Sequence, residues 1–164
     1  MLERVIERLS GLLKGLSAAC LGAMVLLTCV DVVGRAVARP VLGAVEVTGL
    51  LATLALAFSL PYAHRQRAHV GVELLYMRLG SRARGAVDLL TGALGTALFA
   101  AIAWKSADYA SQMRASGEVS MTLQLPTYLV IYLIAASFAV LALVQFADVV
   151  RSAAAVRRSG EAAP

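Results

Sequence analysis

The sequence has little of what enzymes and metal-binding proteins use. Its 164 residues include 2 cysteines, 2 histidines and 1 tryptophan. Cys20 and Cys29 fall in one predicted helix, about 13 Å apart at a rise of 1.5 Å per residue, which excludes an intrahelical disulfide. We expect both to be small buried apolar residues. The sequence has no Cys-x-x-Cys pair, no glycine-rich phosphate loop and no serine–histidine–aspartate set, so enzyme activity is not expected.

Charged residues are also scarce, at 15% of the chain, whereas 60% of the residues are hydrophobic. A soluble domain is nearer half apolar. Several apolar runs have the length of about 20 residues that a helix needs to cross a bilayer core of about 30 Å. Alternating segments of about 10 residues, typical of membrane β-barrels, are absent. We therefore predict an all-α integral membrane protein that forms a single membrane domain over residues 1–164.

Four apolar runs predict four transmembrane helices. Their expected ranges are about 12–33, 41–63, 86–104 and 126–147. Pro61, near the end of the second run, is expected to kink or terminate that helix. The basic segment from His64 to Arg84 follows. Its apolar residues at i, i+3, i+4 and i+7 predict a short cytoplasmic interfacial helix over about residues 70–79, with a plain polar loop as the alternative.

The N-terminal segment MLERVIERLSGLLK also has apolar residues at helical spacing, so it can lie along the membrane surface before the first span. Ala36-Val37-Ala38 has the form of a signal-peptide cleavage site. We expect an uncleaved first span instead, because two glutamates precede the apolar run and the run exceeds a typical signal peptide.

Small residues recur every four positions in three of the predicted spans. Such ladders allow two helices to approach closely, and close packing is what holds helices together in lipid. The ladders are Gly11, Gly15, Ala19 and Ala23; Gly49, Thr53 and Ala57; and Ala93, Ala97 and Ala101.

The basic residues predict the topology. Four spans place both termini on one side, together with the segment between the second and third spans. That side carries 11 of the 15 lysines and arginines. Because loops rich in lysine and arginine stay in the cytoplasm, both termini and the middle segment are expected to be cytoplasmic.

Glu46 is the main candidate for chemistry within a span. A carboxylate in lipid usually faces protein or water. Three interpretations stay open: an ion pair with Arg35 or Arg39, a buried contact with a partner subunit, and a proton or cation site. Asp31 and Asp88 lie near span ends, where water or arginine reaches them, and we expect them to be structural.

Cofactor and nucleic-acid binding are not expected. His64 and His69 lie in one basic loop, whereas a membrane cytochrome places its axial histidines inside facing spans. The net charge of +5 is spread through loops without interleaved aromatic residues, so it reflects lipid and topology and not nucleic acid.

Four short motifs occur in order along the chain. They are Asp31-Val-Val-Gly-Arg35, Glu46, His69-Val-Gly-Val-Glu73 and Leu125-Pro126. They end the first span, open the second, follow the second and open the fourth. In this order and spacing the chain resembles the small membrane subunit of tripartite ATP-independent periplasmic (TRAP) transporters. That family shows a His-hydrophobic-x-hydrophobic-acid element after the second span, with aspartate frequent where this chain has Glu73. The resemblance covers nearly the whole chain.

The resemblance implies a role in a bacterial inner membrane. Such a subunit pairs with a large multi-span subunit that holds the substrate and sodium sites. A periplasmic binding protein delivers an organic acid such as a C4-dicarboxylate or sialic acid. The small subunit acts as a scaffold and offers part of the outer docking surface. Candidate partner or structural contacts are then Asp31, Arg35, Glu46, His69 and Glu73.

One alternative is a self-sufficient small four-helix transporter that uses Glu46 as its proton carrier. Small four-helix exporters place a central glutamate in the first span, whereas Glu46 is off-centre in the second. A cytochrome-type redox anchor is a further alternative, and the histidine positions disfavour it.

Overall fold

Four long helices make up most of the chain that the structure describes. In this computed structural model the described residues are 2–66 and 81–161. The helices are α1 (Leu2–Ala36), α2 (Ala44–Arg65), α4 (Ser81–Ser116) and α5 (Thr127–Glu161). Each is long and apolar enough to cross a membrane, and the described ranges contain no strand. The predicted all-α membrane fold with four transmembrane helices is confirmed. The predicted interfacial helix at 70–79 lies outside the described residues.

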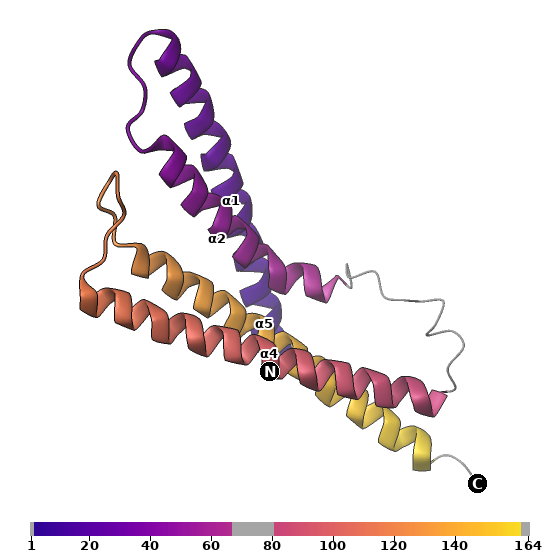
Figure 1. Ribbon diagram of the computed structural model, residues 1–164. Coiled ribbons are helices and arrows are strands. Elements are labelled where there is room, and N and C mark those ends of the chain that lie inside the picture. The colour runs from indigo at the N-terminus through magenta and orange to yellow at the C-terminus, as the bar shows by residue number, and fades with distance from the viewer. Residues whose placement is uncertain (1, 67–80, 162–164) are drawn as a thin grey trace.

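The helices form two hairpins. α1 packs along α2, and α4 packs along α5. The hairpins are joined mainly through α2 and α5, with a smaller contact between α1 and α5. Their closed ends diverge, but the loop 117–126 extends back toward the first residues of α2 (Figure 1). We call the end that holds the turn 37–43 and the loop 117–126 the loop end.

Three helices extend beyond the predicted spans. α1, α4 and α5 have 35, 36 and 35 residues, which corresponds to about 50 Å each, against a bilayer core of about 30 Å. The N-terminal segment is not a separate surface helix, because α1 runs unbroken through it. An apolar run marks the part of a helix suited to lipid, whereas the backbone stays helical until a breaker or a cap ends it.

The core lies where α2 meets its neighbours. Buried apolar residues on α2 include Ala55, Ala57 and Phe58, and α5 contributes Leu141 and Val144. Small side chains at these positions let the helices approach closely. The cysteines do not belong to this core: Cys20 is half-buried and Cys29 is exposed, so the expectation that both are buried is wrong for this chain alone.

Candidate functional site

The first motif, Asp31-Val-Val-Gly-Arg35, closes the C-terminal end of α1. The Asp31 carboxylate accepts a hydrogen bond of 2.8 Å from Arg35 Nε and one of 3.0 Å from the backbone N–H of Val41. Asp31 is buried, although it lies near the end of a span. The carboxylate therefore joins the last turn of α1 to the chain that leads into α2.

Gly34 allows the helix to end where it does. Ala38 has φ 55°, and the N–H groups of Ala38 and Arg39 donate to the carbonyls of Arg35 and Gly34 at 3.2 and 2.7 Å. This is the Schellman pattern of a helix C-terminus, with a left-handed residue after the last turn. A Cβ on Gly34 would collide with the Arg39 carbonyl oxygen. The motif is thus a local folding signal.

Glu46 lies in the first turn of α2 and reaches a loop 76 residues away in the sequence. Its Oε2 accepts a 3.2 Å hydrogen bond from the backbone N–H of Thr122. Its Oε1 is buried without a bonded partner. The Leu123 side chain fills the space beside Gly43, where an added Cβ would lie 2.5 Å from the leucine. Gly43 has φ 74°, so both its conformation and this close approach suit glycine.

The loop that Glu46 contacts has its own order. Ser120 and Leu125 exchange hydrogen bonds of 3.0 Å, with Ser120 N–H donating to the Leu125 carbonyl and Leu125 N–H donating to Ser120 Oγ. Gln124 lies in the left-handed region with φ 52°. The loop is therefore a closed turn with the Thr122 amide directed at α2.

An ion pair of Glu46 with Arg35 or Arg39, one of its three interpretations, is not present among the described residues. Arg35 lies instead with its Nε 2.8 Å from Asp31 Oδ2, one turn away on the same helix. The structure gives Glu46 a backbone amide as its bonded partner. His69 and Glu73 fall outside the described residues. Leu125 and Pro126 immediately precede α5, which begins at Thr127.

The opposite end of α2 carries polar contacts that sequence reasoning missed. His64 Nε2 lies 3.7 Å from Asp148 Oδ2 on α5. Lys14 Nζ lies 4.2 Å from the centre of the Tyr62 ring and 3.1 Å from its hydroxyl oxygen. Lys14 and Tyr62 are 48 residues apart in the sequence, so no local motif reveals their contact.

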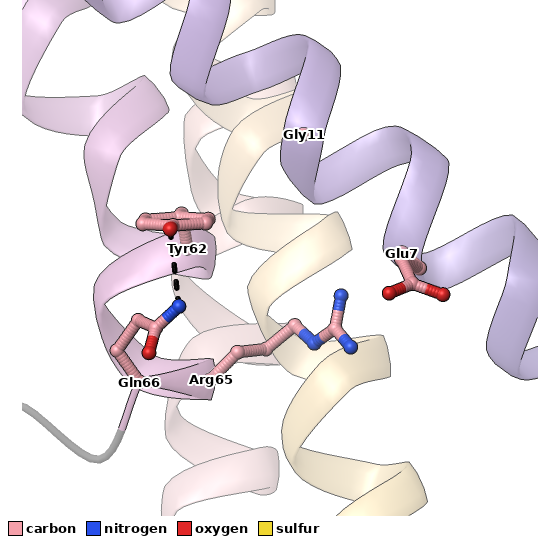
Figure 2. Close-up of a pocket in the computed structure, with 5 residues that line it drawn as sticks. All are labelled: Glu7, Gly11, Tyr62, Arg65 and Gln66. Atoms are coloured by element: carbon pink, nitrogen blue, oxygen red, sulfur yellow. Dashed lines mark hydrogen bonds between the residues drawn. The ribbon is translucent and has the colours of Figure 1, made fainter.

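A polar cleft of about 340 Å³ opens beside Tyr62, between α1 and α2. Figure 2 shows Gln66 bonded to the Tyr62 hydroxyl, while Arg65 extends across the cleft toward Glu7. The lining residues are Glu7, Gly11, Tyr62, Arg65 and Gln66. The described residues contain no group of three or more histidine, cysteine, aspartate or glutamate side chains that could hold a metal ion.

Serine hydroxyls complete the packing of α2 on both sides. Ser17 Oγ on α1 donates to the Ala55 carbonyl at 2.8 Å. Ser137 Oγ on α5 donates to the Ala57 carbonyl. Pro61 has no N–H, so it cannot supply the helical bond that the Ala57 carbonyl would otherwise accept. Ser137 replaces that bond, as serines of neighbouring helices do around prolines in lipid. α2 continues to Arg65, so termination at Pro61 is wrong.

Most of the small-residue ladders face away from the chain. Every member of the ladders on α1 and α4 is exposed, and Gly11 and Gly15 have no atom within 4 Å of an added Cβ. On α2, Gly49 is exposed as well, whereas Ala57 is buried. The helix contacts inside the chain use other positions, such as Gly92, where an added Cβ would collide with Val149.

These features define an all-α membrane protein in which several of the described polar groups bond helix ends and neighbouring helices, while the small-residue ladders on α1 and α4 are exposed. The chain belongs to the family described as tripartite ATP-independent periplasmic transporters, DctQ component, whose family model matches residues 24–155. It is thus the small membrane component of a transporter, and the family is not one of enzymes. Neither the curated proteins nor the solved structures compared with the chain gave a match.

Proposed function

We propose that this chain is the scaffold and docking subunit of a sodium-coupled importer of an organic acid. In this proposal a large multi-span subunit holds the substrate and sodium sites, and a periplasmic binding protein delivers the acid. Membership of the tripartite family supports the proposal. The observation that carries the scaffold role is the exposure of the small-residue ladders on α1 and α4.

Those ladders suit a helical partner. Lipid tails are as apolar as leucine, so helices in a bilayer associate through close contact and not through the hydrophobic effect. Glycine and alanine permit such contact, but Gly15, Ala19 and Ala97 are exposed in this chain. A large membrane subunit packed on α1 or α4 would cover them.

The polar groups of the spans favour a scaffold role and argue against a transport path through this chain. A path requires polar groups across the depth of the bilayer. The buried polar residues among those described are Ser10, Ser17, Asp31 and Ser137. Ser17 and Ser137 donate hydrogen bonds to a neighbouring helix, and Asp31 accepts one from Arg35 on its own helix, whereas Ser10 Oγ has no bonded partner. Glu46 lies in the first turn of α2, near one end of the span.

The direct test of this assignment is assembly. The chain, tagged and co-expressed with the large membrane subunit of its own transport system, should co-purify with it in detergent at a constant ratio. An unrelated multi-span protein expressed at the same level is the control. Recovery of the large subunit and of the unrelated protein in equal amounts with the tagged chain would contradict a specific scaffold role.

The proposed orientation in the bacterial inner membrane has both termini and the 64–84 segment in the cytoplasm, because that side carries most of the basic residues. Single cysteines at Ser116 and Ser81, in a chain with Cys20 and Cys29 changed to alanine, test it. An impermeant maleimide added to intact spheroplasts should label position 116 and leave position 81 unlabelled. The reverse pattern would reject this orientation.

A further inference from the structure

The Glu46 carboxylate at the start of α2 accepts a hydrogen bond from the loop 117–126. We propose that Glu46 is a positioning residue that holds this loop beside the turn 37–43, so that the two form one surface for the periplasmic binding protein. This inference rests on the proposed function, because it names the residue that arranges the docking surface.

At the loop end, few contacts join the two hairpins among the described residues. Glu46 Oε2 accepts the Thr122 N–H at 3.2 Å, and Leu123 packs against Gly43. A hydrogen bond to a charged acceptor is roughly twice as strong as a neutral one. The Thr122 amide lies outside both helices and faces the carboxylate. The carboxylate thus fixes the position of the loop relative to the first hairpin.

The surface that results carries apolar side chains outside the helices. Met121 is fully exposed, and Leu42 in the neighbouring turn is 82% exposed. Val119 is also exposed. These residues lie beyond the ends of the membrane-crossing helices, which stop at Ser116 and resume at Thr127. In the proposed topology this loop and the turn 37–43 lie on the periplasmic side, where exposed apolar side chains outside the helices are typical of a protein contact.

The binding protein is the occupant that this position favours. The large subunit lies in the bilayer, where the exposed ladders of α1 and α4 are available to it. The loop lies outside the helices, at the end that the distribution of basic residues assigns to the periplasm. Methionine adapts its shape to a partner surface, which suits a contact that forms and separates in each transport cycle. A loop already held in place also costs less entropy to dock.

Hydrogen exchange tests the contact itself. In the purified complex with the large subunit, the Thr122 amide and its neighbours within residues 117–125 should exchange at least fivefold faster in Glu46→Ala than in the wild type. Asp108→Ala is the matched control, since it removes an exposed carboxylate from α4 away from the loop and should leave exchange unchanged. Equal exchange in the wild type and Glu46→Ala would overturn the positioning role, whatever the transport result.

Uptake kinetics test whether the contact between Glu46 and Thr122 promotes docking of the binding protein. Initial uptake into liposomes is measured against the concentration of substrate-loaded binding protein. Glu46→Ala should raise the half-saturating concentration about fivefold to tenfold and leave the maximal rate within twofold, as expected for loss of one charge-assisted hydrogen bond. Glu46→Gln should stay within about twofold of the wild type, because its amide oxygen still accepts the Thr122 N–H.

A chemical cross-link between positions 46 and 122 distinguishes loss of the loop position from loss of the Glu46 charge. In a chain with Cys20 and Cys29 changed to alanine, the pair Glu46→Cys and Thr122→Cys is joined with a short bismaleimide. Cross-linking should restore the half-saturating concentration of the binding protein. Restoration supports positioning, and a defect that persists after cross-linking overturns it. A lower maximal rate with an unchanged half-saturating concentration would assign Glu46 to ion coupling instead. If wild-type uptake does not depend on the binding protein, the proposed function fails, and the docking inference fails with it.

Discussion

Two kinds of helix face in this protein contain small residues, and they differ in what covers them. In the most apolar windows of α2 and α5, 28% of residues are buried, against 11% in α1 and 6% in α4. The face between α2 and α5 is filled by residues such as Ala57, Pro61 and Ser137. The ladders on α1 and α4 consist of glycine and alanine and are exposed.

The comparison teaches that a small-residue ladder identifies a face able to pack closely but not its partner. An added Cβ at Gly92 would collide with Val149, whereas at Gly15 it would meet no atom within 4 Å. Both glycines lie in helices, and their backbones are alike. Only the three-dimensional structure separates a contact inside the chain from a face left for another subunit.

Substitution of the inner glycine should produce the larger effect on the chain itself. Gly92→Leu forces a branched side chain against Val149, and overpacking of this kind costs about 1–3 kcal/mol. Unfolding of the purified chain in mixed detergent micelles, followed by circular dichroism, measures the change. Gly92→Ala is the graded control, with a smaller loss. Unchanged stability of Gly92→Leu would mean that α4 and α5 are not in contact there.

Substitution of the outer ladders should affect assembly and spare the fold. Gly15→Leu and Ala97→Leu place a large side chain at exposed positions, and leucine is a good helix former. We expect at least a tenfold loss of association with the large subunit for one or both variants. Co-purification at defined protein ratios measures it, with unfolding in micelles as the control. Normal assembly of the double variant would show that these faces contact only lipid.

The bond between Ser137 and the Ala57 carbonyl should have the smallest of these effects. Ser137→Ala leaves a buried carbonyl without a donor, and the expected loss is about 1 kcal/mol in unfolding free energy. In a Pro61→Ala background the new N–H of residue 61 satisfies the same carbonyl. Ser137→Ala should therefore cost less than half as much there. Equal costs in both backgrounds would reject the pairing of serine with proline.

Local patterns in the sequence predicted the helices and the family. Apolar run length predicts a membrane helix because the bilayer sets the length required. The motif from Asp31 to Arg35 could be located by sequence, and the structure explains it by contacts within ten residues. The predicted helix ends were less accurate, because the apolar run of each span stops before the backbone hydrogen bonding of its helix does.

Contacts between distant segments could not be predicted in the same way. Glu46 meets an amide 76 residues away, and Ser137 meets a carbonyl 80 residues away. Backbone groups carry no side-chain signal, so nothing in the sequence marks Thr122 or Ala57 as the partner. The interpretation that paired Glu46 with Arg35 or Arg39 rested on proximity in sequence. Arg35 binds Asp31 on α1 instead.

The central claim is that this chain works only as part of a complex. Reconstitution in liposomes with an imposed sodium gradient tests it, with the chain alone, the large subunit alone, and both together, each with and without loaded binding protein. Uptake of the organic acid should require both membrane subunits and the binding protein, and the chain alone should match empty liposomes. Uptake by the chain alone, abolished by Glu46→Gln, would contradict the account and establish a self-sufficient small transporter.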